Sequence, residues 1–350
     1  MMTKIDTEKQ KLIKKPMALF SHPTQVIWID DDIAFVEKRA AEIMIEEDAL
    51  YFNLFDNPEQ ALAYISDQAA KDPYYDDTYV PSIASSSSDD GVETDLNDTM
   101  SYYFSNRDRH NHIAVILVDQ DMPVMSGDVF CRKLDELNLP VKIIMITGKE
   151  KADFGINLLS EDYVDVFIEK KDLELTPKII KAIHSLHYKH FYGLSSVHFQ
   201  AITADPQSPL DNKAFQAFFN HICQQHAIVE YEFINTEGDA ILQTRSGELR
   251  LLGVACDAAL DELNDLFDSY EVDSSNDLVL ALRQREKIPL FLTAEDEQKP
   301  IEAWSAYFHP AKAIDNLPGF YYTLVDDLSA YQLDEDKVFS YEDYLRSRQS

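Results

Sequence analysis

Cysteine is scarce in this sequence, and its scarcity excludes a small scaffold held together by disulfides. The three cysteines, Cys131, Cys223 and Cys256, lie far apart and form no CxxC pair. Sparse, unpaired cysteines are typical of a reducing compartment, where each thiol behaves as a small buried side chain. The sequence therefore predicts a cytoplasmic protein.

Long apolar runs and basic residues are also in short supply. No segment approaches the ~20 apolar residues that span a bilayer, and the lysine-rich first 15 residues lack the apolar centre of a signal peptide, so we expect no membrane association. Only 31 Lys and Arg stand against 63 Asp and Glu, a net charge of −32, and residues 191–350 hold 11 basic against 28 acidic residues. A field of this sign repels phosphate backbones and disfavours nucleic-acid binding.

The residues that are present indicate a globular protein. With 350 residues, 45% of them hydrophobic, the chain is long enough for two ordinary domains. Short apolar runs separated by helical patterns predict parallel strands over 25–29, 49–55, 113–118, 141–146 and 164–168. Helices are expected over about 34–44, 58–66, 127–137, 149–159 and 176–190. This alternation is typical of an α/β fold with a doubly wound, five-stranded parallel sheet.

One connection within this pattern is unusually long. Residues 69–111 show little periodicity and include a serine run at 85–88, while aromatic residues near both ends predict that the ends pack against the domain. We interpret the segment as a surface insertion. An arm that docks a partner protein is the alternative.

Polar residues follow four of the predicted strands at their carboxyl ends. In doubly wound sheets ligands bind at this edge, so we expect the side chains to converge there. The motifs, in chain order, are Asp30-Asp31-Asp32, Asp119-Gln120-Asp121-Met122-Pro123 with Gly127, Thr147-Gly148, and Glu169-Lys170. Each motif alone is an ordinary turn or cap. Their joint order resembles the receiver domain of bacterial two-component response regulators, which has the CheY-like fold.

The resemblance implies a site that forms an aspartyl phosphate. Asp119 would be the phosphoacceptor and would attack a phosphoryl group carried by a sensor histidine kinase or a phosphotransfer protein. Lys170 would supply a positive charge, and Thr147 a hydroxyl, for the phosphoryl oxygens. Any catalysis would be self-catalysed phosphotransfer and dephosphorylation, and no separate enzyme class is evident.

The resemblance also implies a magnesium cofactor. Ionised carboxylates held close together repel one another, and a hard divalent cation relieves that repulsion. Asp31 and Asp119 are expected to bind Mg²⁺ directly, Asp30 through water, and Asp121 through its backbone carbonyl.

Two features beside the fifth strand have alternative interpretations. Lys171 stands where the resemblance implies a proline after a cis bond, so this loop is either strained or shaped differently. Strand alternation favours Lys170 over Lys171 as the lysine that points inward. Phe167 occupies the position of an aromatic switch residue that would move with Thr147, and an ordinary edge-strand aromatic is the alternative.

Three histidines recur at three-residue spacing on the last predicted helix of this half. They are His184, His187 and His190. Metal ligation would need further ligands nearby, so we expect them to form a solvated face of the helix.

Residues 191–350 follow the pattern of an α+β domain with an antiparallel sheet. Helices are predicted over 212–226, 258–270 and 277–286, and strands over 228–235, 240–244, 248–256, 304–314 and 320–326, with hairpin turns at 236–239 and 316–319. This order is compatible with a PAS-like sensor or interaction module. Residues 328–350 are expected to form a polar tail.

These patterns divide the chain into an N-terminal extension (1–23), a receiver domain (24–190) with the insertion at about 69–111, and an α+β output domain (191–350) that ends in the polar tail. No catalytic motif is found in the output domain. We therefore expect a protein-interaction output that does not bind DNA, including a phosphorylation-dependent homodimer. The alternative is a receiver-gated enzyme whose acidic clusters at 326–327 or 334–336 bind a metal, although solvated acidic surface is the simpler interpretation.

Overall fold

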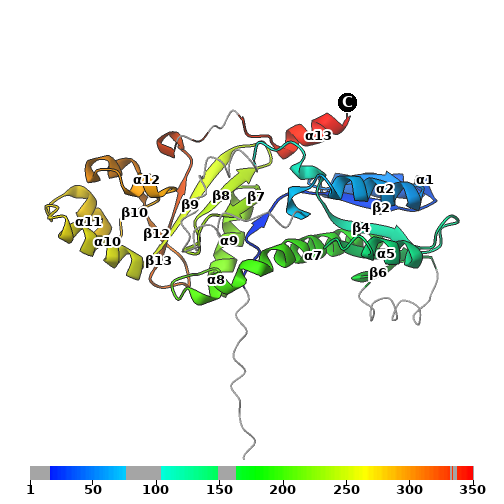
Figure 1. The fold of residues 1–350 in the computed structure, drawn as a ribbon, viewed down its shortest axis with the longest axis horizontal. Helices are drawn as coiled ribbons and strands as arrows, with labels where there is room; N and C mark the ends of the chain where they lie inside the picture. The colour runs from blue at the N-terminus through cyan, green and yellow to red at the C-terminus, as the bar shows by residue number, and fades with distance from the viewer. Residues whose placement is uncertain (1–15, 76–103, 149–162, 332, 334–336, 350) are drawn as a thin grey trace, which may run out of the picture.

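The computed structural model describes residues 16–75, 104–148, 163–331, 333 and 337–349. The molecule is elongated, with a parallel sheet and its helices at one end and an antiparallel sheet with further helices toward the other (Figure 1). The long helix α7 (Leu175–Ser195) runs from one domain to the other. No helix in the described part of the chain is long and apolar enough to cross a bilayer.

The first domain contains the predicted parallel sheet, which within the described residues has five strands in the order β3-β2-β4-β5-β6. The strands are β2 (Gln25–Ile29), β3 (Tyr51–Phe55), β4 (Ile113–Asp119), β5 (Lys142–Thr147) and β6 (Val166–Glu169). The helices around it are α1 (Ile33–Glu46), α2 (Pro58–Ala69), α5 (Gly127–Asp135) and α7. The helix predicted over 149–159 lies outside the described residues.

Alternate residues of the central strands pack on opposite faces of this sheet. Val26 and Trp28 belong to the core beneath α1 and α7, whereas Ile27 and Ile29 belong to the core beneath α2 and α5. Strand β4 is buried at every position, which explains its continuous apolar run. Both cores hold the strand ends, and therefore the polar residues that follow them, in fixed positions.

The second domain is built on an antiparallel sheet, as predicted. Within the described residues its order is β1-β7-β8-β9-β13-β12, and β10 pairs with β11 in a separate ribbon. The strands are β1 (Phe20–Ser21), β7 (Ile228–Phe233), β8 (Ala240–Thr244), β9 (Leu249–Cys256), β10 (Lys287–Pro289), β11 (Phe308–Pro310), β12 (Lys312–Ala313) and β13 (Phe320–Val325). The helices are α8 (Phe199–Ala204), α9 (Lys213–Gln225), α10 (Asp257–Ser269), α11 (Asp277–Arg283) and α12 (Ala294–Glu297). The likeness to PAS modules stays a prediction.

Both ends of the described chain differ from the sequence-based expectation. Residues 17–20 are buried in the core of the second domain, and Phe20 pairs with Glu232 of β7, because four consecutive apolar residues complete that core. The expected polar tail contains helix α13 (Tyr341–Gln349), in which Tyr341 and Tyr344 are buried. The Tyr341 hydroxyl donates to the Ala49 carbonyl of the first domain at 2.9 Å, so the tail connects the two domains.

Two further segments refine the predictions. The strand expected over 304–314 is interrupted: a 3₁₀ helix (Ile301–Ala306) buries Trp304 in an apolar cluster, and two short strands follow on either side of Ala311. The ends of the long insertion pack down, as predicted, since Tyr74 and Phe104 are buried and Tyr74 stacks on Phe20. Residues 76–103 lie outside the described part of the chain.

Candidate functional site: an acidic pocket at the sheet edge

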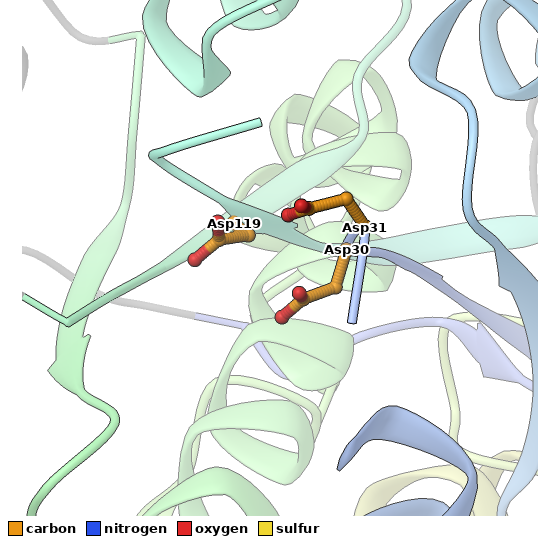
Figure 2. Close-up of side chains that lie close together, drawn as sticks. All are labelled: Asp30, Asp31 and Asp119. Carbon is orange, nitrogen blue, oxygen red and sulfur yellow. The ribbon is translucent and has the colours of Figure 1, made fainter. Parts of the chain in front are cut away.

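Three carboxylates converge at the carboxyl edge of the parallel sheet (Figure 2). Asp30 and Asp31 follow β2, Asp119 ends the neighbouring strand β4, and one oxygen from each lies within 4.8 Å of the others. Among the described acidic, histidine and cysteine side chains, these three aspartates lie close enough together to share one metal ion. Asp30 and Asp119 are buried, whereas Asp31 is exposed and opens the group to solvent.

Lys170 reaches into this pocket from the end of β6. Its Nζ lies 2.7 Å from Asp30 Oδ2 and 2.9 Å from Asp119 Oδ1. Burial disfavours the ammonium, but the hydrogen bonds with Asp30 and Asp119 outweigh burial and raise the pKa of Lys170. Lys171 is exposed, so Lys170 is the inward-pointing lysine. No described peptide bond is cis, so the bond between Lys170 and Lys171 is trans.

Backbone N–H groups hold the two buried carboxylates in place. Asp119 Oδ2 accepts from the N–H of Asp121 at 3.0 Å, and Asp30 Oδ1 accepts from that of Asp32 at 3.0 Å. Burial raises the pKa of Asp30, against the opposing effect of Lys170. The pocket therefore concentrates negative charge where desolvation makes it costly, and a cation lowers that cost.

Gly127 and Phe35 also contribute to the pocket, and the sequence singled out only Gly127. A Cβ on Gly127 would lie 2.5 Å from the Asp119 carbonyl oxygen, so only glycine allows α5 to begin this close to the end of β4. The ring of Phe35, in the first turn of α1, lies 5.2 Å from Lys170 Nζ in a cation–π contact. The glycine of the motif after Asp119 signalled the close approach of α5 to β4. Nothing in the residue spacing signalled the contact of Phe35 with Lys170.

The remaining predicted residues lie around the pocket. Thr147 ends β5, next to β6, and its carbonyl accepts from the Lys170 N–H at 2.8 Å. A Cβ on Gly148 would meet no atom of the described residues within 4 Å. Phe167 is partly buried on β6. The switch roles of Thr147 and Phe167 stay predictions.

The donor set suits Mg²⁺. This ion prefers carboxylate, carbonyl and water oxygens in a small octahedral shell, and it usually takes one or two carboxylates from the protein. Asp31 and Asp119 would hold the ion, and an oxygen of Asp30 lies within 4.8 Å of theirs. A metal contact from the Asp121 carbonyl stays a prediction. In this structure the positive charge of Lys170 partly neutralises the negative charge of Asp30 and Asp119.

The histidines of α7 do not form a solvated face, and this expectation was wrong. His190 is 1% exposed, His187 is partly buried, and His184 is the member of the three that lies toward solvent, 3.5 Å from Glu47. The reason is that α7 is covered on this side by residues of both domains, including His22 and Pro140.

The acidic clusters of the second domain show no metal geometry within the described residues. Asp326 lies 3.4 Å from Arg250, and Asp327 Oδ1 accepts from the Ser329 N–H, as expected for surface carboxylates. Residues 334–336 lie outside the described part of the chain.

A cavity of about 290 Å³ lies in the second domain beside the first turn of α10. Its most buried acid, Asp239, accepts hydrogen bonds from the Val254 N–H at 2.6 Å and from Asn235 Nδ2 at 2.8 Å, and burial raises the pKa of Asp239 to about 7. The Cys256 thiol in the same wall faces the amide of Gln207, not a base. These polar groups support the hairpin and form no nucleophile–base pair.

Comparison with known proteins shows how far this architecture is shared. No protein-family model matches the chain. The solved structure of the response regulator LqsR from Legionella pneumophila superposes with a TM-score of 0.72 and 22% sequence identity, and the match covers 94% of this chain and 95% of that one. The two chains share one fold. The likeness extends across both domains, so the receiver-type sheet and the antiparallel domain occur together in a protein described as a response regulator.

A curated relative adds a short sequence match. The transcriptional regulatory protein CutR of Streptomyces coelicolor is 32% identical over 57 residues, and the same figures hold for CutR of Streptomyces lividans. The matched segment is 15% of this chain and spans about a quarter of the relative's length. A CheY-like receiver domain from Methanospirillum hungatei aligns with 48% of this chain at 16% identity and a TM-score of 0.32.

Proposed function

We propose that the chain is a response regulator in which Asp119 accepts a phosphoryl group from a sensor histidine kinase or phosphotransfer protein, in a Mg²⁺-dependent reaction. The observation that carries this proposal is the contact of Lys170 Nζ with both Asp30 and Asp119, beside the exposed carboxylate of Asp31. A structural salt bridge needs one carboxylate, whereas three carboxylates and a lysine at a solvent-open edge are suited to binding a phosphoryl group.

The residues of the pocket account for the expected chemistry. A carboxylate oxygen of Asp119 attacks the phosphorus, a new P–O bond forms, and the P–N bond to the donor histidine breaks. The N–H of Asp121 orients Asp119, and Lys170, which contacts Asp119, would bind the phosphoryl oxygens together with the Thr147 hydroxyl. A bound Mg²⁺ would supply further positive charge for those oxygens. Phosphoryl transfer needs little beyond this positioning and charge neutralisation.

The output is proposed to be a protein interaction, including a homodimer formed on phosphorylation, in the cytoplasm. The strongly acidic second domain argues against nucleic acid as the partner. A receiver-gated enzyme is not favoured, because Asp239, the most buried acid in the wall of the second-domain cavity, is already used in structural hydrogen bonds.

The test is acceptance of a phosphoryl group from phosphoramidate, with Mg²⁺ present, followed by intact mass spectrometry and size-exclusion chromatography. Wild type should gain one phosphoryl group and elute earlier. Asp119→Asn should gain none. Asp67→Asn, which changes an exposed carboxylate on α2 that pairs with Lys71, is the matched control and should still be phosphorylated. Equal acceptance by Asp119→Asn and wild type would refute the proposal.

A further inference from the structure

Five histidines gather where the two domains meet, in the described part of the chain. His22 follows β1, His110 and His112 precede β4, and His187 and His190 lie on α7. Burial lowers the pKa of His22, His110 and His190 well below the usual range, and that of His187 to about 4. These four imidazoles are therefore neutral at pH 7.

His112 differs from the others because it has two side-chain partners. Its Nδ1 lies 2.6 Å from Asp72 Oδ2, and its Nε2 lies 2.6 Å from His190 Nε2. His190 Nδ1 in turn lies 2.9 Å from the carbonyl oxygen of Pro140. The four groups form one chain of three hydrogen bonds, from a carboxylate through two imidazoles to a carbonyl.

The number of protons in this series of hydrogen bonds follows from which of its atoms can donate. A carbonyl oxygen only accepts, so His190 Nδ1 carries a hydrogen, and neutral His190 then accepts at Nε2. His112 Nε2 must donate to it. Neutral His112 would then have a bare Nδ1 facing a carboxylate, which is two acceptors at 2.6 Å. A third proton is needed between Asp72 and His112.

We propose that Asp72, His112 and His190 form a proton-binding site that holds one proton more than an ionised carboxylate and two neutral imidazoles contain. The extra proton either lies on His112, which gives an imidazolium–carboxylate pair, or on Asp72, which gives a carboxylic acid that donates to His112. The number of bound protons is the same in both cases. Because Asp72 follows α2, His112 precedes β4 and His190 lies on α7, the proton completes a link among three elements of the first domain.

The groups around His112 do not replace this proton. Its ring lies against the rings of His22, Tyr74, Tyr75 and Phe191, with centroids 4.9–5.7 Å away. Burial raises the pKa of Tyr75, whose hydroxyl donates to the Ile113 carbonyl.

The charged groups farther out have counter-charges of their own. Arg109 is paired with Glu230, and Lys142 lies 3.8 Å from Asp165. Asp72 is therefore the carboxylate that balances the extra proton, and its Oδ1 is already engaged by the Tyr74 N–H at 2.9 Å.

Proton linkage gives the direction of the effect. Above the ordinary imidazole pKa of about 6.5, the unfolded chain has an ionised Asp72 and neutral imidazoles, whereas the folded site holds one proton more. The folded state thus binds more protons, so raising the pH favours unfolding. The unfolding constant should rise about tenfold per pH unit until the folded site loses its proton.

Asp72→Asn tests this inference. Its Oδ1 would still accept from Tyr74, while its Nδ2 would donate to His112 Nδ1, so all three hydrogen bonds form without an extra proton. The ratio of the wild-type unfolding constant to that of the variant, measured in urea, should rise about tenfold per unit between pH 7 and 8.5. Asp67→Asn on the exposed face of α2 is the control, and its ratio should stay flat. A flat ratio for Asp72→Asn refutes the site.

A second measurement does not depend on the variant folding. Long-range ¹H–¹⁵N spectra of the wild type at pH 7.5 should show His190 neutral with its hydrogen on Nδ1. They should also show either His112 with both nitrogens protonated, or, in ¹³C spectra, a protonated Asp72 carboxyl. Neutral His112 together with an ionised Asp72 overturns the proposal.

Discussion

Replacing Arg109 should weaken the whole molecule, because its guanidinium connects the two domains without contact with water. Arg109 precedes β4 of the first domain and is 1% exposed. Its Nε and Nη2 donate to the two oxygens of Glu230 on β7, at 2.8 and 3.1 Å. The remaining donors go to Gln243 and to the carbonyls of Phe104, Asn106 and Phe339.

The size of the effect follows from what Arg109→Met leaves behind. A methionine fills part of the space but strands a buried carboxylate and several carbonyls. Breaking a buried pair on one side costs about 3–5 kcal/mol, because the partner's charge remains desolvated. Adding Glu230→Leu removes the stranded charge and should recover at least about 1 kcal/mol. Recovery should be incomplete, since the carbonyls still lack their donor.

Urea unfolding followed by tryptophan fluorescence measures this loss. The two tryptophans, Trp28 and Trp304, lie in the cores of different domains, so the signal reports on both. Arg346→Met removes an arginine whose side chain is 67% exposed and paired with Glu342, and should cost less than about 1 kcal/mol. If Arg109→Met costs no more than this control, the pair does not contribute to stability as argued.

Three further predictions concern the pocket and the thiols. Gly127→Ala should lower the free energy of unfolding in urea by about 1–3 kcal/mol, because the added Cβ meets a backbone oxygen. Gly193→Ala is the control: its Cβ would meet no described atom within 4 Å, and it lies on a helix, so it should stabilise the protein slightly. Equal effects would contradict the close approach of Gly127 to the Asp119 carbonyl. With a disulfide reagent in native conditions, Cys131 should react slowest, because it is buried whereas Cys223 and Cys256 are partly exposed, and burial raises the pKa of the Cys131 thiol to about 12. Early labelling of Cys131 contradicts this. Mg²⁺ affinity measured by calorimetry should start to fall, on acidification, at a pH above the ordinary aspartate pKa, since burial raises the pKa of Asp30 and lets protons compete there. An affinity that stays constant down to that range counts against the site.

Much of the first domain could be predicted from sequence because buried parallel strands leave a strong pattern. β2 begins and ends at the residues predicted for it, and the polar residues after each strand can converge only at one edge of the sheet. Strand alternation favoured Lys170 over Lys171 as the lysine that points inward, and Lys170 Nζ lies between two carboxylates.

The parts that could not be predicted depend on contacts between segments distant in sequence. Residues 17–20 look like a lead-in until β7 provides an edge for Phe20 to pair with. The spacing of the histidines along α7 predicted a solvated His190, and only the packing of α7 between the two domains buries it. The pairing of Arg109 with Glu230 spans 121 residues of sequence and has no local signal.

The most direct test of the account is to locate the phosphoryl group itself. Wild-type protein treated with phosphoramidate, in Mg²⁺ or in excess EDTA, should gain the group only in Mg²⁺. Borohydride reduction converts an aspartyl phosphate to homoserine, and peptide mass spectrometry should then find that residue at position 119. Homoserine at another position, or equal phosphorylation in EDTA, would contradict the acidic pocket as the site of transfer.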